Sequence, residues 1–132
     1  MKQTADTSFF IRVSEGITKA IEIWGDITDG KSRLVIPTVV LVELKNRFLK
    51  LGLSEKIEKL LATFEHSGRI TLAPLTTDLA KKAGSLSYTY NMTNFDAVIL
   101  ATAIETEHKS VLTSDPFFLK PAKDGLIDVI KL

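Results

Sequence analysis

The sequence predicts an α/β fold with a mostly parallel sheet. Short apolar or β-branched runs alternate with longer stretches in which apolar residues recur every three or four positions, as in strands joined by amphipathic helices. Residues 95–104 are apolar on nearly every face, which suits a helix covered by protein all round. Acidic residues follow two of the expected strands. Because ligands of such folds bind at the C-terminal ends of strands, these acids mark the expected site.

Composition narrows the class of protein. The chain has 132 residues, enough for one domain over 1–132. Hydrophobic residues make up 45%, charged residues 25%, and the formal net charge is +1, which argues against disorder and against a strongly basic nucleic-acid coat. There are no cysteines, which excludes disulfides and thiolate metal sites. No apolar run approaches ~18 residues, so we expect a cytoplasmic protein without a membrane span.

The first half of the chain should hold two strands and three helical segments. Residues 2–5 form a short, polar first strand, and Thr7 and Ser8 are suitable caps for the helix that follows. The helical pattern that continues to the turn at 29–32 places Ile17, Ile21 and Trp24 on its inner face. The second strand is expected at 33–36. The next helix starts at 37–38 and closes at Gly52, with a strand over 39–42 as the alternative; its expected inner positions are Val40, Leu41, Leu44, Phe48 and Leu51.

The second half continues the alternation. Ser54 is expected to cap a helix that stops at Gly68, and 69–73 should form the third strand. Thr76 and Thr77 start a helix that reaches about residue 90. The apolar helix follows, and 110–115 form a strand that Pro116 stops. Residues 117–120 are expected in a loop or single turn, and 126–130 in the last strand.

Four acids fall where such a fold gathers them. Asp6 and Asp115 end strands, Asp96 heads the apolar helix and Glu43 lies two turns into the helix after the second strand. If they meet at one edge of the sheet, their repulsion calls for a hard divalent cation. Oxygen-only ligands favour Mg²⁺ or Mn²⁺ over zinc. Such ions activate water and stabilise the leaving oxygen of a phosphodiester.

These residues resemble the PIN domain, especially the small ribonucleases that act as toxins of prokaryotic toxin–antitoxin pairs. The resemblance spans almost the whole chain, and some members have a further acid where this chain has Phe117. It is carried by four segments in order, namely Asp6-Thr7-Ser8, Val42-Glu43-Leu44, Asn94-Phe95-Asp96-Ala97 and Thr113-Ser114-Asp115 with Phe118.

The resemblance implies a three-layer α/β/α fold with five parallel strands in the order 3-2-1-4-5. It further implies metal-dependent cleavage of RNA by a cytoplasmic homodimer that a small antitoxin protein inhibits. By match to the family motif, Asp6, Glu43, Asp96 and Asp115 are the metal-binding catalytic acids. Thr7 and Thr113 are then hydroxyl neighbours of the metal.

Other functions remain open from the residues. The family resemblance also fits an RNA-processing nuclease outside a toxin pair, or a PIN-like domain kept only for binding. A receiver-like signalling module would also bind magnesium through acids, but Asp6 has no acidic neighbour.

Each acid also has a purely structural interpretation. Asp96 could form a capping pair with Thr93, and Glu43 could form a surface ion pair with Arg47. Asp115 could belong to an ordinary turn before Pro116, and Asp6 could merely start a helix.

Overall fold

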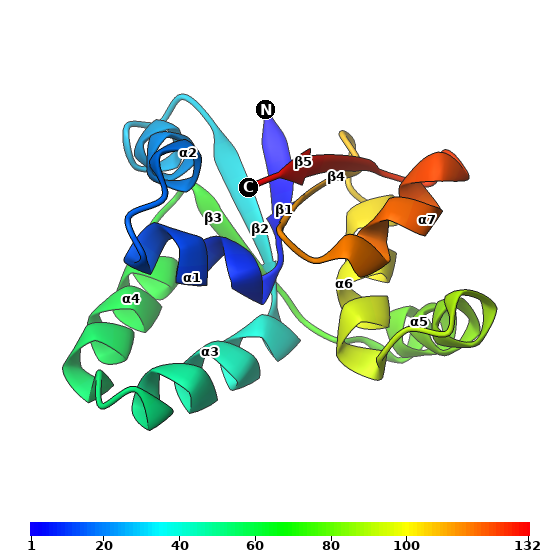
Figure 1. The fold of residues 1–132 in the computed structure, drawn as a ribbon, viewed down its shortest axis with the longest axis horizontal. Helices are drawn as coiled ribbons and strands as arrows, with labels where there is room; N and C mark the ends of the chain where they lie inside the picture. Colours follow the sequence, from blue (N-terminus) through cyan, green and yellow to red (C-terminus); the bar gives the residue numbers. More distant parts are fainter.

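Five short parallel strands form one sheet in the computed structural model, which describes residues 1–132. The strand order is β3-β2-β1-β4-β5 and every neighbouring pair is parallel, as the predicted fold class requires (Figure 1). A receiver-like module is excluded, because those domains have the order 2-1-3-4-5. The strands are β1 (Lys2–Ala5), β2 (Arg33–Pro37), β3 (Ile70–Ala73), β4 (Ser110–Thr113) and β5 (Asp128–Lys131).

Helices cover both faces of the sheet and complete a three-layer architecture. Helices α1, α2 and α4 lie on one side and α5, α6 and α7 on the other, while α3 runs past the lower ends of the strands (Figure 1). None of them combines the length and the hydropathy that a membrane crossing requires. The helices are α1 (Thr7–Ser14), α2 (Thr18–Thr28), α3 (Thr38–Lys50), α4 (Ser54–His66), α5 (Thr77–Tyr90), α6 (Asn94–Ile104) and α7 (Leu119–Lys123), with a 3-10 turn, η1 (Pro116–Phe118), before α7.

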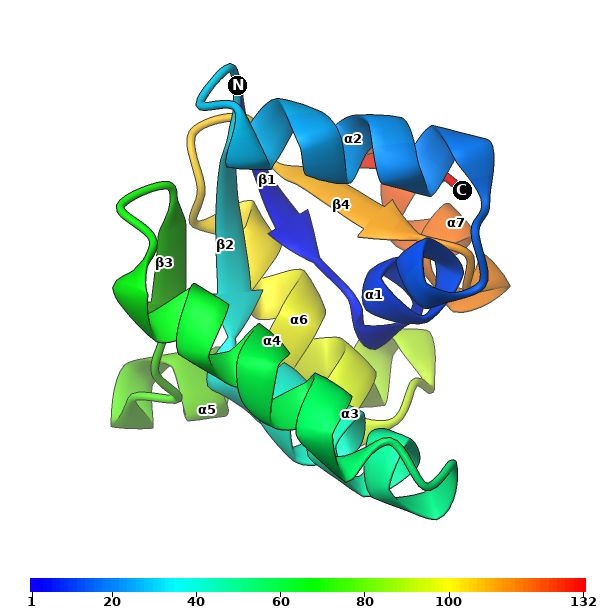
Figure 2. The same ribbon diagram turned by 90° about the vertical axis from the view of Figure 1, so that its left-hand side faces the viewer.

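Helix α6 is the apolar centre of the fold. Every residue from Ala97 to Ala103 is buried, as expected of a helix covered all round, but Phe95 at the start of the expected run is 41% exposed. The helix packs against β1, β2 and β4, and α5 packs along its outer side. Figure 2 shows α6 behind the sheet, with its N-terminal end toward the lower ends of the strands. Its N-terminal turn, which carries Asp96, therefore lies near the edge where the strands end.

The polar first strand is the central strand of the sheet. Gln3 and Thr4 are 6% and 0% exposed because β2 and β4 flank β1 and helices cover both faces. The Thr4 hydroxyl has no hydrogen-bond partner, so this strand buries an unsatisfied polar atom. Strand propensity carries no information about place in the sheet, which explains why the sequence of β1 looks like that of an edge strand.

The expected first helix is two helices, and two of its expected inner positions are wrong, whereas Trp24 and Ala20 pack against the core as predicted. Helix α1 ends at Ser14, and Gly16 takes a positive φ of 80° at the break before α2. Ile17 and Ile21 are 40% and 46% exposed, because α2 restarts the helical phase and buries Ala20 and Ile27 instead.

Four smaller expectations also need correction. Ser54 does not cap α4 through its side chain, since the residue at the cap is Leu53. Leu51 is 63% exposed because it lies beyond the last turn of α3. The segment 117–120 is helical, divided between η1 and α7, and the last strand begins at Asp128, two residues later than expected.

Candidate active site

The acids Asp6 and Asp115 meet because their strands are neighbours. Strand β1 pairs in parallel with β4, with Ala5 opposite Leu112, and Asp6 N–H extends this ladder by donating to Leu112 O at 3.1 Å. Asp6 follows the last residue of β1, and Asp115 lies two residues beyond the end of β4. Both therefore stand at the C-terminal edge of the sheet, as predicted.

Asp6 is the most tightly held of the four acids. It is 5% exposed and caps α1 by accepting from Thr7 N–H at Oδ1, 2.7 Å away. Its Oδ2 accepts from Thr113 Oγ1 at 2.6 Å and from Ser8 Oγ at 3.0 Å. Thr7 and Ser8 were expected to be the caps, but the carboxylate of Asp6 takes that place. The three donors fix the carboxylate in one orientation.

Glu43 approaches from α3. It is half-buried between the exposed Val42 and the fully buried Leu44, so it lies at the border of the core. Thr7 Oγ1 donates to Glu43 Oε1 at 3.2 Å, which joins the first turn of α1 to α3. No ion pair forms between Glu43 and Arg47, although the Arg47 charge opposes part of the rise in the Glu43 pKa.

Asp96 lies in the first turn of α6 and also takes part in its cap. Its N–H donates to Thr93 Oγ1 at 3.2 Å, so the cap interpretation describes the backbone correctly. The environment of the Asp96 side chain shows a second role. Burial and the charges of Asp115, Asp6 and Glu43 raise the pKa of Asp96 to about 6. The Asp96 carboxylate is therefore close enough to the other three acids for their charges to act on it.

Asp115 completes the edge. Its Oδ1 accepts from Phe117 N–H at 2.9 Å, which caps η1, and its own N–H donates to Thr113 Oγ1 at 2.9 Å. The turn role and the proposed site role use different parts of the residue, because the second carboxylate oxygen has no protein donor.

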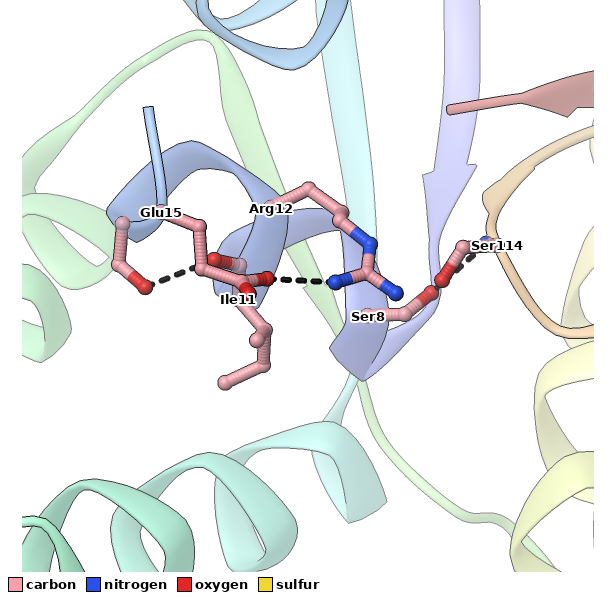
Figure 3. A network of polar contacts seen from close by, with 6 residues as sticks. Ser8, Ile11, Arg12, Glu15 and Ser114 are labelled. Atoms are coloured by element: carbon pink, nitrogen blue, oxygen red, sulfur yellow. Dashed lines mark hydrogen bonds and ion pairs between the residues drawn. The ribbon is translucent and has the colours of Figure 1, made fainter. Parts of the chain in front are cut away.

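Ser8 also contributes to the candidate active site, although the sequence predicted it only as a helix cap. Besides its bond to Asp6, its Oγ accepts from Ser114 N–H at 2.9 Å and so ties α1 to the loop after β4 (Figure 3). The signal in the sequence was a serine two residues after an acid, a spacing typical of Asx-type turns.

The four carboxylates form a connected field of negative charge. Burial raises the pKa of Asp6, with a smaller contribution from Asp115 and opposition from the bonds to Thr113 and Ser8. Burial likewise raises the pKa of Glu43, as do the charges of Asp6 and Asp115. No lysine or arginine forms an ion pair with any of them. The edge is thus an uncompensated anionic site.

The donor set fits a hard cation in its chemistry. All four acids offer oxygen, and neither histidine nor cysteine stands among them, which suits Mg²⁺ or Mn²⁺. The charges of Asp115, Asp6 and Glu43 contribute to the raised pKa of Asp96, yet no three of the carboxylates close around a single point as a ligand cage. The carboxylates of Glu43 and Asp96 are half-buried and less tightly held than Asp6, which accepts from three donors, so they can adjust more.

The chain is similar to known proteins in sequence and in structure. A family model described as "PIN domain" matches residues 4–124. In structure, the chain resembles the "VapBC2" of Rickettsia felis, bound to a DNA fragment from their promoter, with a TM-score of 0.73, 16% identity, and coverage of 99% of this chain and 98% of that one. It also resembles a toxin–antitoxin complex from Klebsiella pneumoniae, with a TM-score of 0.66, 19% identity and 86% of each chain covered. No curated protein sequence matches it.

Proposed function

The chain belongs to the PIN domain family of nucleases, and on this premise we propose that it is a Mg²⁺- or Mn²⁺-dependent endoribonuclease acting as the toxin of a toxin–antitoxin pair. The observation that carries the proposal is the field of four mutually repelling acids, Asp6, Glu43, Asp96 and Asp115, at the C-terminal edge of this sheet. Such an edge is where α/β folds place their ligands.

Each residue has a distinct part in the proposed reaction. A divalent cation held by the four acids would activate water and stabilise the leaving oxygen of the RNA phosphodiester. Thr113 holds Asp6 and the backbone of Asp115 with one hydroxyl, which fixes two of the acids relative to each other. Thr7 holds Glu43 in the same way. Asp6 and Asp115 thus form a rigid side of the site, and Glu43 and Asp96 an adjustable one.

The surface beside Glu43 supports a protein partner. Val42, Leu49 and Leu51 are 61%, 49% and 63% exposed, an unusual density of apolar side chains along one helix and its end. A hollow of about 340 Å³ lies nearby between α1, α2, α3 and α4, with Phe10, Trp24 and Phe48 among its lining residues. We propose that an apolar segment of a small antitoxin docks here. The similar structure from Klebsiella pneumoniae is a toxin–antitoxin complex, which supports this choice.

The proposed antitoxin would also inhibit the active site. An arginine at the end of such a segment could enter the acidic edge and neutralise it much as a cation does. The proposal also includes a homodimer, as the family resemblance implies.

Two experiments test the function. The purified protein is incubated with structured and unstructured RNAs in Mg²⁺, in Mn²⁺ and in EDTA, and we expect cleavage only with a metal. Cleavage that survives EDTA would contradict the metal-dependent mechanism. Induced expression in bacteria should slow growth, and Asp96→Asn should relieve it. Normal growth at confirmed high expression of an RNA-cleaving protein would favour an RNA-processing nuclease outside a toxin pair.

A further inference from the structure

A second feature adjoins the acidic edge on the side of β5. A hollow of about 240 Å³ shares Thr113 and Asp115 with the candidate active site. Its remaining wall includes the aliphatic side chains of Leu119 and Val129, and the ammonium-bearing Lys131. The hollow therefore joins an acid of the proposed reaction to an apolar surface and a cation.

The fold holds Lys131 close to Asp115. Lys131 is the last residue of β5 and the register partner of Thr113, so the two backbones are separated by one strand spacing, about 4.8 Å. Leu132 N–H continues the pairing by donating to Thr113 O at 3.3 Å.

The charge of Lys131 is not used by the protein. The side chain is exposed, and no carboxylate lies within 4.0 Å of its ammonium. Arg12, on α1, is by contrast engaged by Glu15 at 2.6 Å (Figure 3). Lys131 is thus an unpaired cation that shares the lining of this hollow with Thr113 and Asp115.

An anionic site that acts on a polyanion needs such a cation. RNA phosphates beside the scissile bond are repelled by the four carboxylates, and lysine contacts to flanking phosphates are the usual source of affinity. The aliphatic wall of the hollow suits the less polar surface of a ribose or a base. Free phosphate would bind the ammonium group of Lys131 but would gain no affinity from contacts with the aliphatic wall.

We infer that this hollow is the binding subsite for the nucleotide next to the scissile phosphate of single-stranded RNA. Lys131 binds its phosphate, and Leu119 and Val129 contact its sugar and base. The inference rests on the proposed nuclease function and adds to it the surface along which the substrate lies.

The test compares two lysines that differ only in place. Lys131→Gln removes the proposed contact, and Lys31→Gln removes an exposed lysine just before β2, at the opposite end of the sheet. Binding of a labelled single-stranded RNA is measured by fluorescence anisotropy in EDTA over a range of salt concentrations. For Lys131→Gln we expect about fivefold weaker binding and a slope of log affinity against log salt reduced by about 0.7, the value of one phosphate contact on a single strand. Lys31→Gln should behave as the wild type.

Two further variants separate charge from structure. Lys131→Arg should restore binding because it retains the cation, and Leu119→Glu should weaken binding because it adds an anion to the apolar wall. In cleavage assays with metal, Lys131→Gln should raise KM about fivefold and change kcat less than about twofold.

The two proposals fail in different ways. If the wild type cleaves RNA and the two glutamine variants have equal affinity and equal salt slope, the subsite is wrong and the nuclease stands. If the wild type cleaves no RNA in any metal, the nuclease proposal is wrong. A binding difference between the two variants would then still support the RNA contact at Lys131.

Discussion

The hydroxyl of Thr113 joins two acids of the candidate site, because it donates to Asp6 Oδ2 at 2.6 Å and accepts from Asp115 N–H at 2.9 Å. It is 1% exposed, so both bonds are shielded from water. Thr113→Val keeps the shape and removes both. We expect a loss of about 1–3 kcal/mol in the free energy of unfolding, measured by urea denaturation, since Asp6 and Asp115 N–H each lose a buried partner.

Thr4 supplies the matched control for this substitution. It is a buried threonine of the adjacent strand, but its hydroxyl has no partner. Thr4→Val should therefore leave the free energy of unfolding unchanged or raise it by about 1 kcal/mol. Equal losses in the two variants would show that the Thr113 bonds contribute nothing specific.

Asp96→Asn should stabilise the metal-free protein. The pKa of Asp96, raised to about 6 by burial and the other three acids, means that its charge is unfavourable in the folded state. Removing that charge outweighs the few tenths to about 1 kcal/mol that a negative charge gives at a helix N-terminus. Thermal scans in EDTA at low salt should show a higher Tm for the variant.

The same scans in excess Mg²⁺ complete this prediction. Mg²⁺ should raise the Tm of the wild type by binding the native state, and the rise should be largely lost in Asp96→Asn. A variant that melts below wild type in EDTA and keeps the full Mg²⁺ response would leave Asp96 as a helix cap alone.

The metal-free protein should lose stability as the pH rises from about 4 to 6. In this window the unfolded chain has released the Asp96 proton, at its ordinary pKa of 3.8, while the folded state still holds it. The penalty is complete above the folded pKa and amounts to roughly 1–2 kcal/mol after discounting for solvent screening. Asp6 and Glu43, whose pKa values are also raised, act in the same direction. Urea denaturation in EDTA at several pH values measures this slope, and Asp96→Asn should flatten it. If the wild type instead gained stability between pH 4 and 6, the proposed repulsion among the four acids would be wrong.

Ser8→Ala should loosen the site from the side of α1. The substitution removes the bond to Asp6 and leaves Ser114 N–H without its acceptor. We expect a loss of about 1–2 kcal/mol in the free energy of unfolding and a lower kcat. Ser14→Ala is the control, because its hydroxyl contacts only Ile11 O at the exposed end of the same helix. A Ser8 variant no different from the Ser14 variant would remove Ser8 from the site.

Asp115→Asn should abolish RNA cleavage with little effect on folding. Its side chain makes one bond, to Phe117 N–H, which the amide oxygen of asparagine can still accept. A loss of about 100-fold or more in kcat is expected for a proposed metal ligand. Asp128→Asn, at an exposed position of β5, is the control and should retain full activity. Unchanged cleavage by Asp115→Asn would remove this residue from the site.

The sequence predicted correctly those features that follow from the local residue pattern and from the position of a residue at the end of a helix or strand. The apolar run of α6 predicted a fully covered helix, and the turn before it predicted where Asp96 would stand. The acids after β1 and β4 were placed at one edge because parallel strands end on the same side. The strand order came from the family resemblance, since local pattern does not determine which strands are neighbours.

It was harder to predict which face of a helix is buried and how deeply a residue lies in the core. The break at Gly16 shifts the helical register, so Ile17 and Ile21 face solvent although their spacing is regular. The burial of Asp6 follows from the central place of β1, which its polar residues conceal. The contacts of Ser8 and Thr113 join segments more than a hundred residues apart, and no local rule finds such pairs.

That separation has a consequence for biosynthesis. The bond between Asp6 and Thr113 spans 107 residues, so strand β4 leaves the ribosome long after β1. Until then Asp6 has neither its hydroxyl donor nor Asp115, so a nascent or truncated chain that ends before β4 carries an unassembled edge. The proposed nuclease can therefore assemble only after β4 has been synthesised.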